Sequence, residues 1–232
     1  MGKPTKPATR RRKVASTDEV SPRIARRERR RDRSREEIID AARRVLLRDG
    51  LAATTLGAVA KEVGLTKAAL YYYYPSKDAL LFEVVFGIVE GQSRAIHGAV
   101  AKAHGGGDAL RAIIRETVGT FAARLDDFRL AFLHAQVAGP GLVEIGAEQL
   151  ARLRPLNDLA YAGATQKLAD DWKHGRGRAR VEPRLMAFLA NVAAIGLLTI
   201  KGMVESVDDP LLYSDEQLVD GLARIFEAAA AP

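Results

Sequence analysis

The chain has 232 residues, 47% hydrophobic and 28% charged, which is enough apolar material for one or two domains with a buried core. It has no cysteine, which excludes disulfides and thiolate-bound metals. The net charge of +7 is uneven, because residues 1–35 hold 14 Lys and Arg against four acids and the rest carries −3. A basic arm on a mildly acidic globule indicates a polyanionic partner, most often nucleic acid.

Targeting and membrane segments are not indicated. The basic arm lacks the apolar stretch of a secretory signal, and its four acids argue against a transit peptide. Residues 185–200, "LMAFLANVAAIGLLTI", contain Asn191 and fall short of the roughly 20 residues that a membrane span needs. We expect a buried helix there and no membrane partner, and the absence of cysteine fits a reducing cytosol.

The arm divides into two parts. Residues 1–20 show no periodicity and are expected to be disordered. Pro22 suits the first position of a helix, and the Arg-rich segment that follows is expected to fray in water and become helical on phosphate. The alternative is a solvated tail that only aids solubility. The predicted DNA contacts of the arm are Arg29, Arg30, Arg31 and Arg33.

Four helices are predicted next. Ser34 and Glu37 form a possible capping box for the first, which Gly50 ends. Thr55 caps a second helix that ends near Val63. After a tight turn at Gly64, a third helix is capped by Thr66 and stops before Pro75, and Ser76 caps a fourth.

Four consecutive tyrosines, Tyr71 to Tyr74, lie in the third helix. Successive side chains point about 100° apart, so one core cannot bury all four. Leu70 and Tyr74 share the side expected to face the core. Ala68, Tyr71 and Tyr72 share the outward side, where a phenol can contact a phosphate or a thymine methyl group. Tyr73 lies between the two sides and stays unassigned.

The rest of the chain also has helical periodicity, with no convincing alternating strand, and predicts an all-α protein. Asp108 can cap one helix, and Pro155 starts or kinks a long helix that ends near Lys173. "AGPG" at 138–141 is expected to break the chain between them. The other predicted helices cover residues 128–138, 142–153, 183–205 and 214–230.

Short helix, glycine turn, short helix is the helix-turn-helix arrangement. Residues 34–83 resemble the DNA-binding domain of the tetracycline-repressor (TetR) family of bacterial regulators. The sequence from Glu37 to Val85 is "EIIDAARRVLLRDGLAATTLGAVAKEVGLTKAALYYYYPSKDALLFEVV". The resemblance rests on Gly50, Thr55, Ala60, Gly64, the Leu70-Tyr71 pair and Ser76-Lys77-Asp78. It implies a three-helix DNA-binding domain at 34–80 and an effector-binding and dimerisation domain at 81–232.

The resemblance also implies roles for single residues. The third helix would be the recognition helix, and Lys77 and Thr55 would contact phosphates. Gly57 stands where some members carry a base-reading side chain, so that contact would be absent. Recognition-helix contacts would come from Thr66, Lys67, Ala68, Tyr71 and Tyr72. The implied partner is a double-stranded, palindromic DNA operator.

In this family the last two helices pair with their copies as a homodimer. An ordinary core is the alternative for these apolar residues. The residues assigned to the dimer interface are Leu185, Phe188, Leu189, Val192, Ile195, Leu218, Leu222 and Ile225.

The middle helices are expected to enclose an apolar pocket for a small effector, although each candidate could equally be core. The candidates are Phe121, Phe128, Phe132, His134, Tyr161 and Trp172, with Met186 beside them.

We predict a transcriptional regulator, most simply a repressor released by a hydrophobic effector. The alternative is a DNA binder gated by a protein partner, or an architectural one. An enzyme is not indicated, because the four histidines lack metal-binding spacing and no nucleophile or phosphate-loop motif is present. No cofactor and no metal is expected.

Overall fold

The computed structural model describes residues 22–133, 146–177, 181–204 and 213–232, and every regular element among them is a helix. This confirms the predicted all-α class for the described residues. The predictions for residues 1–21, for the break at 138–141 and for His134 lie outside them. The chain divides into two compact units, Met1–Glu37 and Ile38–Pro232, and each is described by itself.

Helix α1 (Pro22–Ala53) begins at the proline that the sequence marks as a first helical position. The capping box predicted at Ser34 is wrong, since the helix runs through this residue. The Ser34 hydroxyl donates instead to the Arg30 carbonyl one turn earlier, at 3.0 Å, as serines inside helices commonly do. At Gly50 the backbone leaves the helical region with φ 79° and ψ 173°, which confirms the predicted break.

The three caps after Gly50 form as predicted. The hydroxyl oxygens of Thr55, Thr66 and Ser76 each accept a hydrogen bond from the backbone amide three residues on, at 3.0–3.1 Å. Gly64 has a φ of 68° and makes the turn between the two short helices. The helices are α2 (Leu56–Glu62), α3 (Lys67–Tyr73) and α4 (Lys77–Ala101).

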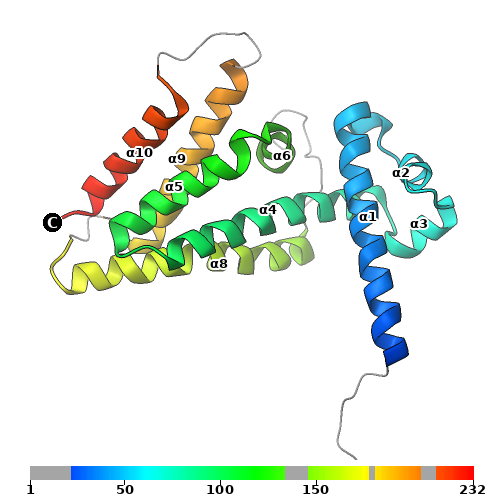
Figure 1. Cartoon of the computed structure of the whole chain (residues 1–232), viewed down its shortest axis with the longest axis horizontal. Helices are drawn as coiled ribbons and strands as arrows, with labels where there is room; N and C mark the ends of the chain where they lie inside the picture. Colours follow the sequence, from blue (N-terminus) through cyan, green and yellow to red (C-terminus); the bar gives the residue numbers. More distant parts are fainter. Residues whose placement is uncertain (1–21, 134–145, 178–180, 205–212) are drawn as a thin grey trace, which may run out of the picture. The chain divides into compact units, whose positions relative to one another are not determined.

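These helices share a small core. Val45 from α1 and Val59 from α2 are fully buried, and Leu70 from α3 meets them. Leu80 and Val84 at the start of α4 close the same cluster. Helix α3 is therefore packed on a small core that it shares with the beginning of the long helix α4 (Figure 1).

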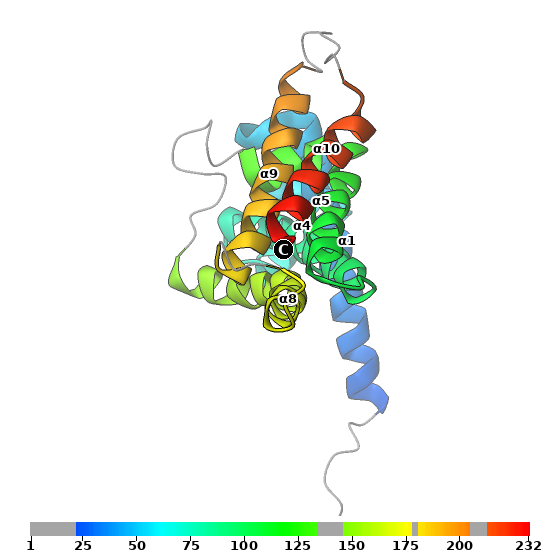
Figure 2. The same cartoon turned by 90° about the vertical axis from the view of Figure 1, so that its left-hand side faces the viewer.

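The remaining helices pack around α5 (Gly106–Ala122), which contacts its neighbours on several sides (Figures 1 and 2). A large core of aliphatic and aromatic side chains lies between them. The other members are α6 (Leu125–Phe128), a π-helical turn η1 (Arg129–Leu133), α8 (Ala147–Lys173), α9 (Pro183–Val204) and α10 (Asp215–Ala230).

Two predicted helix starts need correction. Helix α5 begins at Gly106, so Asp108 is inside its first turn, where its carboxylate accepts the His104 amide at 2.9 Å. Helix α8 begins at Ala147 and continues through Pro155, with its end at Lys173 as predicted. The helix predicted near residues 128–138 is, as far as the structure describes it, the short α6 followed by η1.

Helix α9 is not the fully buried helix that its composition suggests. One face is buried through Met186, Ala190 and Leu198, but the opposite face is open to solvent. By length and composition Pro183–Gly202 would also suffice to cross a membrane, and 33% of its most apolar window is buried. The core helix of a soluble protein passes the same test, so this is weak evidence for a membrane span.

Candidate nucleic-acid interface

The outward side of α3 carries the candidate interface. Tyr71 is 48% exposed and Tyr72 is 64% exposed, whereas Leu70 and Tyr74 on the other side are 0% and 6% exposed. The predicted division of the tyrosine run is therefore confirmed for burial. The contact of the outward side with DNA stays a prediction.

Tyr73 and Lys67 shape this surface from its two edges. Tyr73, which the sequence left unassigned, is half-buried, and its ring meets that of Tyr72 edge to face at a centroid distance of 5.5 Å. The ammonium of Lys67 lies 5.9 Å from the ring centroid of Tyr71, within the range of a cation–π contact. Ala68 is exposed between them. The result is a surface of phenols and one cation with little side-chain bulk at its centre.

The threonine caps leave a donor available beside this surface. Thr55 and Thr66 are both exposed, and each uses its hydroxyl oxygen as an acceptor for a backbone amide. A hydroxyl also carries one hydrogen that it can donate. The two caps can therefore hold their helices and donate to a phosphate at the same time.

Lys77 has a structural role that sequence reasoning missed. Its ammonium donates to the carbonyl of Leu51 at 2.5 Å, just after the helix break at Gly50. An ammonium has three donors, so the predicted phosphate contact remains compatible with this hydrogen bond. The C-terminal end of α1 is thus tied to the beginning of α4.

The basic arm presents its charges to solvent. Arg29, Arg30, Arg31 and Arg33 are all exposed on the first turns of α1 that have described side chains. A helix that carries several arginines on its surface fits a polyanionic backbone. Their contact with DNA also stays a prediction.

A second exposed surface lies on α9 and α10, which run side by side (Figure 2). Phe188 is 47% exposed and Ile225 is 66% exposed, and Ile195, Leu218 and Leu222 are half-buried. An open apolar groove of about 600 Å³ runs along the same helices. It adds Ile200 and Tyr213, which sequence reasoning missed. The exposed members of the predicted interface are Leu185, Phe188, Leu189, Val192 and Ile225.

Of the predicted effector residues that the structure describes, Phe121, Phe128 and Tyr161 are buried in the core, and Phe132 and Trp172 pack against it. The rings of Phe121, Phe128 and Phe132 pack on one another with centroids 5.5–5.8 Å apart. Tyr161 is buried elsewhere against Phe188, at 6.1 Å, and burial raises its pKa to about 12. Within the described part of the chain, the indole nitrogen of Trp172 is buried without a hydrogen-bond partner.

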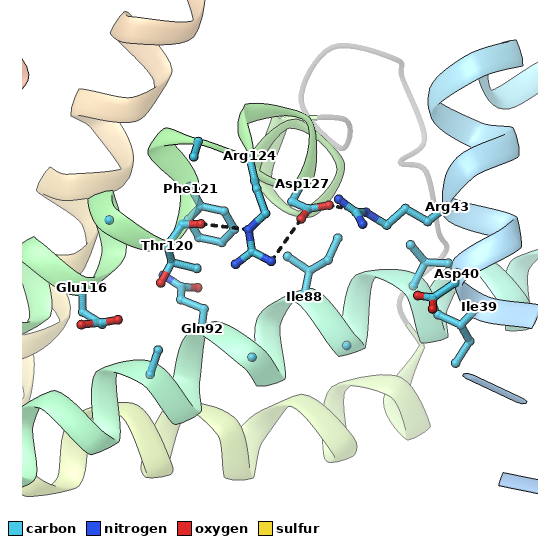
Figure 3. A pocket seen from close by; sticks show the side chains of 16 residues that line it. Ile39, Asp40, Arg43, Ile88, Gln92, Glu116, Thr120, Phe121, Arg124 and Asp127 are labelled. Atoms are coloured by element: carbon cyan, nitrogen blue, oxygen red, sulfur yellow. Dashed lines mark hydrogen bonds and ion pairs between the residues drawn. The ribbon is translucent and has the colours of Figure 1, made fainter. Parts of the chain in front are cut away.

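The structure does contain a large pocket, but in a place that the sequence did not suggest. It has a volume of about 670 Å³ and is lined by residues of α1, α4, α5 and α6, including Phe121 (Figure 3). Gly87 and Gly91 in the middle of α4 form part of its wall. The sequence signal that could have indicated this pocket is the pair of glycines inside a long helix. Among the described residues, no group of three His, Asp or Glu could hold a metal ion.

These features define a class of protein. It is a helix-turn-helix protein in which α3 exposes a phenolic surface and the helices after α4 form a bundle with it. Residues 38–84 match the model of the family described as bacterial regulatory proteins, tetR family. Residues 38–84 are thus a helix-turn-helix region of the TetR family.

Similar proteins support this assignment. The HTH-type transcriptional regulator AcrR of Shigella flexneri is 35% identical over 51 residues, which are 22% of this chain and 24% of that protein. The uncharacterized HTH-type transcriptional regulator YerO of Bacillus subtilis (strain 168) is 31% identical over 98 residues, 41% of this chain and 31% of that one. The matched regions thus span only about a quarter to a third of these relatives.

Solved structures extend the likeness of fold to most of the chain. A TetR/AcrR-family regulator from Thermobifida fusca YX-ER1 has a TM-score of 0.64 at 24% identity, covering 84% of this chain and 96% of that one. The regulator FadR of Bacillus subtilis, solved in complex with stearoyl-CoA, has a TM-score of 0.64 at 14% identity, with 84% and 98% covered.

Proposed function

We propose that the protein is a sequence-specific DNA-binding transcriptional regulator that acts as a homodimer. The observation that carries this proposal is the exposed side of α3, where Tyr71 and Tyr72 project beside Lys67 and a capped helix start. Phenols and one lysine offer few base-specific hydrogen bonds. Affinity is therefore expected to lean on phosphate contacts from the caps, Lys77 and the arm.

The chemistry of the second surface supports the proposed homodimer. One helix-turn-helix reads few base pairs, and two-fold related copies reach successive major grooves about 34–36 Å apart. The exposed aliphatic face of α9 and α10 offers the self-complementary apolar surface that such a pair needs. The expected operator is a palindrome, and the expected place of action is the bacterial cytoplasm, on the nucleoid.

The expected mode of control is repression released by a small hydrophobic effector. FadR of Bacillus subtilis has a similar fold and was solved with stearoyl-CoA, which supports an effector of this general kind. An effector acts only if it binds one conformation of the dimer better than the other. The second candidate, a DNA binder gated by a protein partner or an architectural one, is favoured by the packed phenylalanine cluster where a cavity was expected.

The test is selection of genomic fragments bound by the full chain, repeated with cell extract present. We expect enrichment of a palindrome and release by a small-molecule fraction of the extract. Enrichment without sequence preference would contradict the proposal of a sequence-specific regulator. Release only by the protein fraction would favour the second candidate.

The arm is tested by salt titration of the binding to the enriched fragment. The substitutions Arg29→Gln, Arg30→Gln, Arg31→Gln and Arg33→Gln are combined, because glutamine keeps the helix propensity and removes the charge. Each lost phosphate contact should lower the slope of log affinity against log salt by about 0.9. An unchanged slope would show that the arm is only a solvated tail.

A further inference from the structure

The pocket at the junction of α1, α4, α5 and α6 has the size of a ligand site. Its volume is about 670 Å³, inside the range of about 300–1,000 Å³ that small-molecule sites occupy. Its wall combines apolar groups, including Val84, Ile88 and Phe121, with two arginines and three carboxylates. Figure 3 shows Arg124 reaching into its middle, with Asp127 and Arg43 towards one end and Glu116 at the other.

Three glycines keep this pocket open. Gly87 and Gly91 lie one turn apart on α4, and Gly119 faces them from α5. A Cβ added at any of them would meet none of the described atoms within 4 Å, and none of the three has a positive φ. Neither close helix packing nor backbone conformation therefore calls for glycine here. Glycine inside a helix lowers its stability relative to alanine. What these three glycines provide in the structure is the open space of the pocket.

The polar side of the pocket offers cationic donors. Asp127 is 4% exposed and accepts the Nε–H of Arg43 at 2.5 Å. A terminal nitrogen of Arg124 lies 3.9 Å from its other oxygen. A guanidinium carries five N–H groups in a planar fork that matches a carboxylate or a phosphate. One buried carboxylate thus faces two guanidinium groups, and both side chains line the pocket. Their Nε–H groups are used by Asp127 and by the Thr120 carbonyl, which leaves terminal N–H groups for a ligand.

We infer that this pocket binds a small amphipathic acid, with its anionic head on Arg124 and Arg43 and its apolar part over Gly87, Gly91 and Phe121. The acid competes with Asp127 for Arg43. Because Arg43 belongs to α1 and Asp127 to α6, this competition weakens a direct link between the DNA-binding helices and the rest of the bundle. The regulatory consequence rests on the proposed function, whereas the binding itself does not.

Binding is tested by calorimetry without DNA, using probes that share a ten-carbon chain and differ in the head: decanoate, decyl phosphate, decanol and decyltrimethylammonium. We expect both acids to bind at least about tenfold more tightly than decanol, because charge-assisted hydrogen bonds are the strong ones. Decyltrimethylammonium should bind more weakly than decanol. Absence of binding by both acids, or preference for the cation, would overturn the inference.

The site is located with filled and control variants. Gly87→Leu combined with Gly91→Leu should weaken decanoate binding at least about tenfold, since a leucine pair occupies the space that the tail needs. Gly98→Leu is the control, because Gly98 is equally open on the same face of α4 but does not line the pocket. Thermal unfolding checks that all variants fold. Equal affinity of the filled variant and the control would overturn the site.

The head position is tested with Arg124→Gln, which should bring decanoate to the affinity of decanol and leave decanol unchanged. Arg94→Gln, at an exposed position paired with Glu90 on α4, should change neither. On the enriched DNA fragment, decanoate should lower the affinity of the wild type and not of the filled variant. If the protein binds the acids but no DNA, the proposed function is refuted and the binding site stands. If the DNA affinity is unchanged with the acid bound, the competition for Arg43 is refuted.

Discussion

Two surfaces of this protein expose large apolar side chains to a similar degree, but their surroundings differ. On α3, Tyr72 is 64% exposed beside a lysine, a threonine cap and an alanine. On α10, Ile225 is 66% exposed beside an aliphatic groove. In the proposed function each surface has a partner, as contiguous exposed apolar patches often do. The neighbouring groups favour different partners: donors and a cation suit a phosphate backbone, whereas a mainly apolar face suits a second copy of the chain.

The largest effect is expected from a charge on the aliphatic surface. Ile225→Glu should convert the dimer to monomer, because an unpaired carboxylate in an apolar interface must be desolvated. Light scattering after size exclusion measures the mass, and affinity for the palindrome should fall at least about a hundredfold with it. Arg224→Glu, at the exposed neighbouring position, should leave both unchanged. A dimer that survives Ile225→Glu would mean that this surface has another partner.

The next largest effect concerns the buried side of α3. Tyr74→Ala should lower the free energy of unfolding by about 3 kcal/mol, as for other aromatic residues removed from a core. Denaturant titration gives the value. A loss below about 1 kcal/mol would show that Tyr74 contributes little to the core on which α3 packs.

The exposed side of α3 should behave in the opposite way. Tyr71→Ala combined with Tyr72→Ala should weaken DNA binding about ten- to a hundredfold, since two stacking and phosphate contacts are removed. Stability should change by less than about 0.5 kcal/mol per site, as at other surface positions. Mobility-shift titration and thermal unfolding measure the two quantities. Undiminished DNA affinity would assign the phenols to another role.

The last effect is confined to alkaline pH and concerns Tyr161, whose ring lies against Phe188 between the apolar surface and the core. Burial raises the pKa of Tyr161 to about 12, above the unfolded value of about 10. The unfolded chain therefore loses this proton first, and stability that is present below pH 10 is lost as pH rises towards 12. The loss should reach at most about 2–3 kcal/mol, and Tyr161→Phe should remove this part of the pH dependence. Parallel pH profiles of the two proteins would contradict it.

Local signals predicted the DNA-binding region well. The caps Thr55, Thr66 and Ser76 and the break at Gly50 each depend on groups within a few residues, so the sequence pattern contains the whole interaction. Ser34 shows the limit of such reasoning. The same residue type can cap a helix or bond its own preceding turn, and only the continuation of α1 from Pro22 decides which.

The sequence by itself determined the helical class, the division of the tyrosine run and most helix ends, because these follow from side-chain periodicity and from short-range hydrogen bonds. The tertiary structure decided that Lys77 holds the carbonyl of Leu51, that α9 exposes one apolar face, and that Arg43 meets Asp127 across 84 positions of the chain. The pocket belongs to the same group. A cavity is the space left between helices that are distant in sequence, so no local pattern contains it until those helices are packed together.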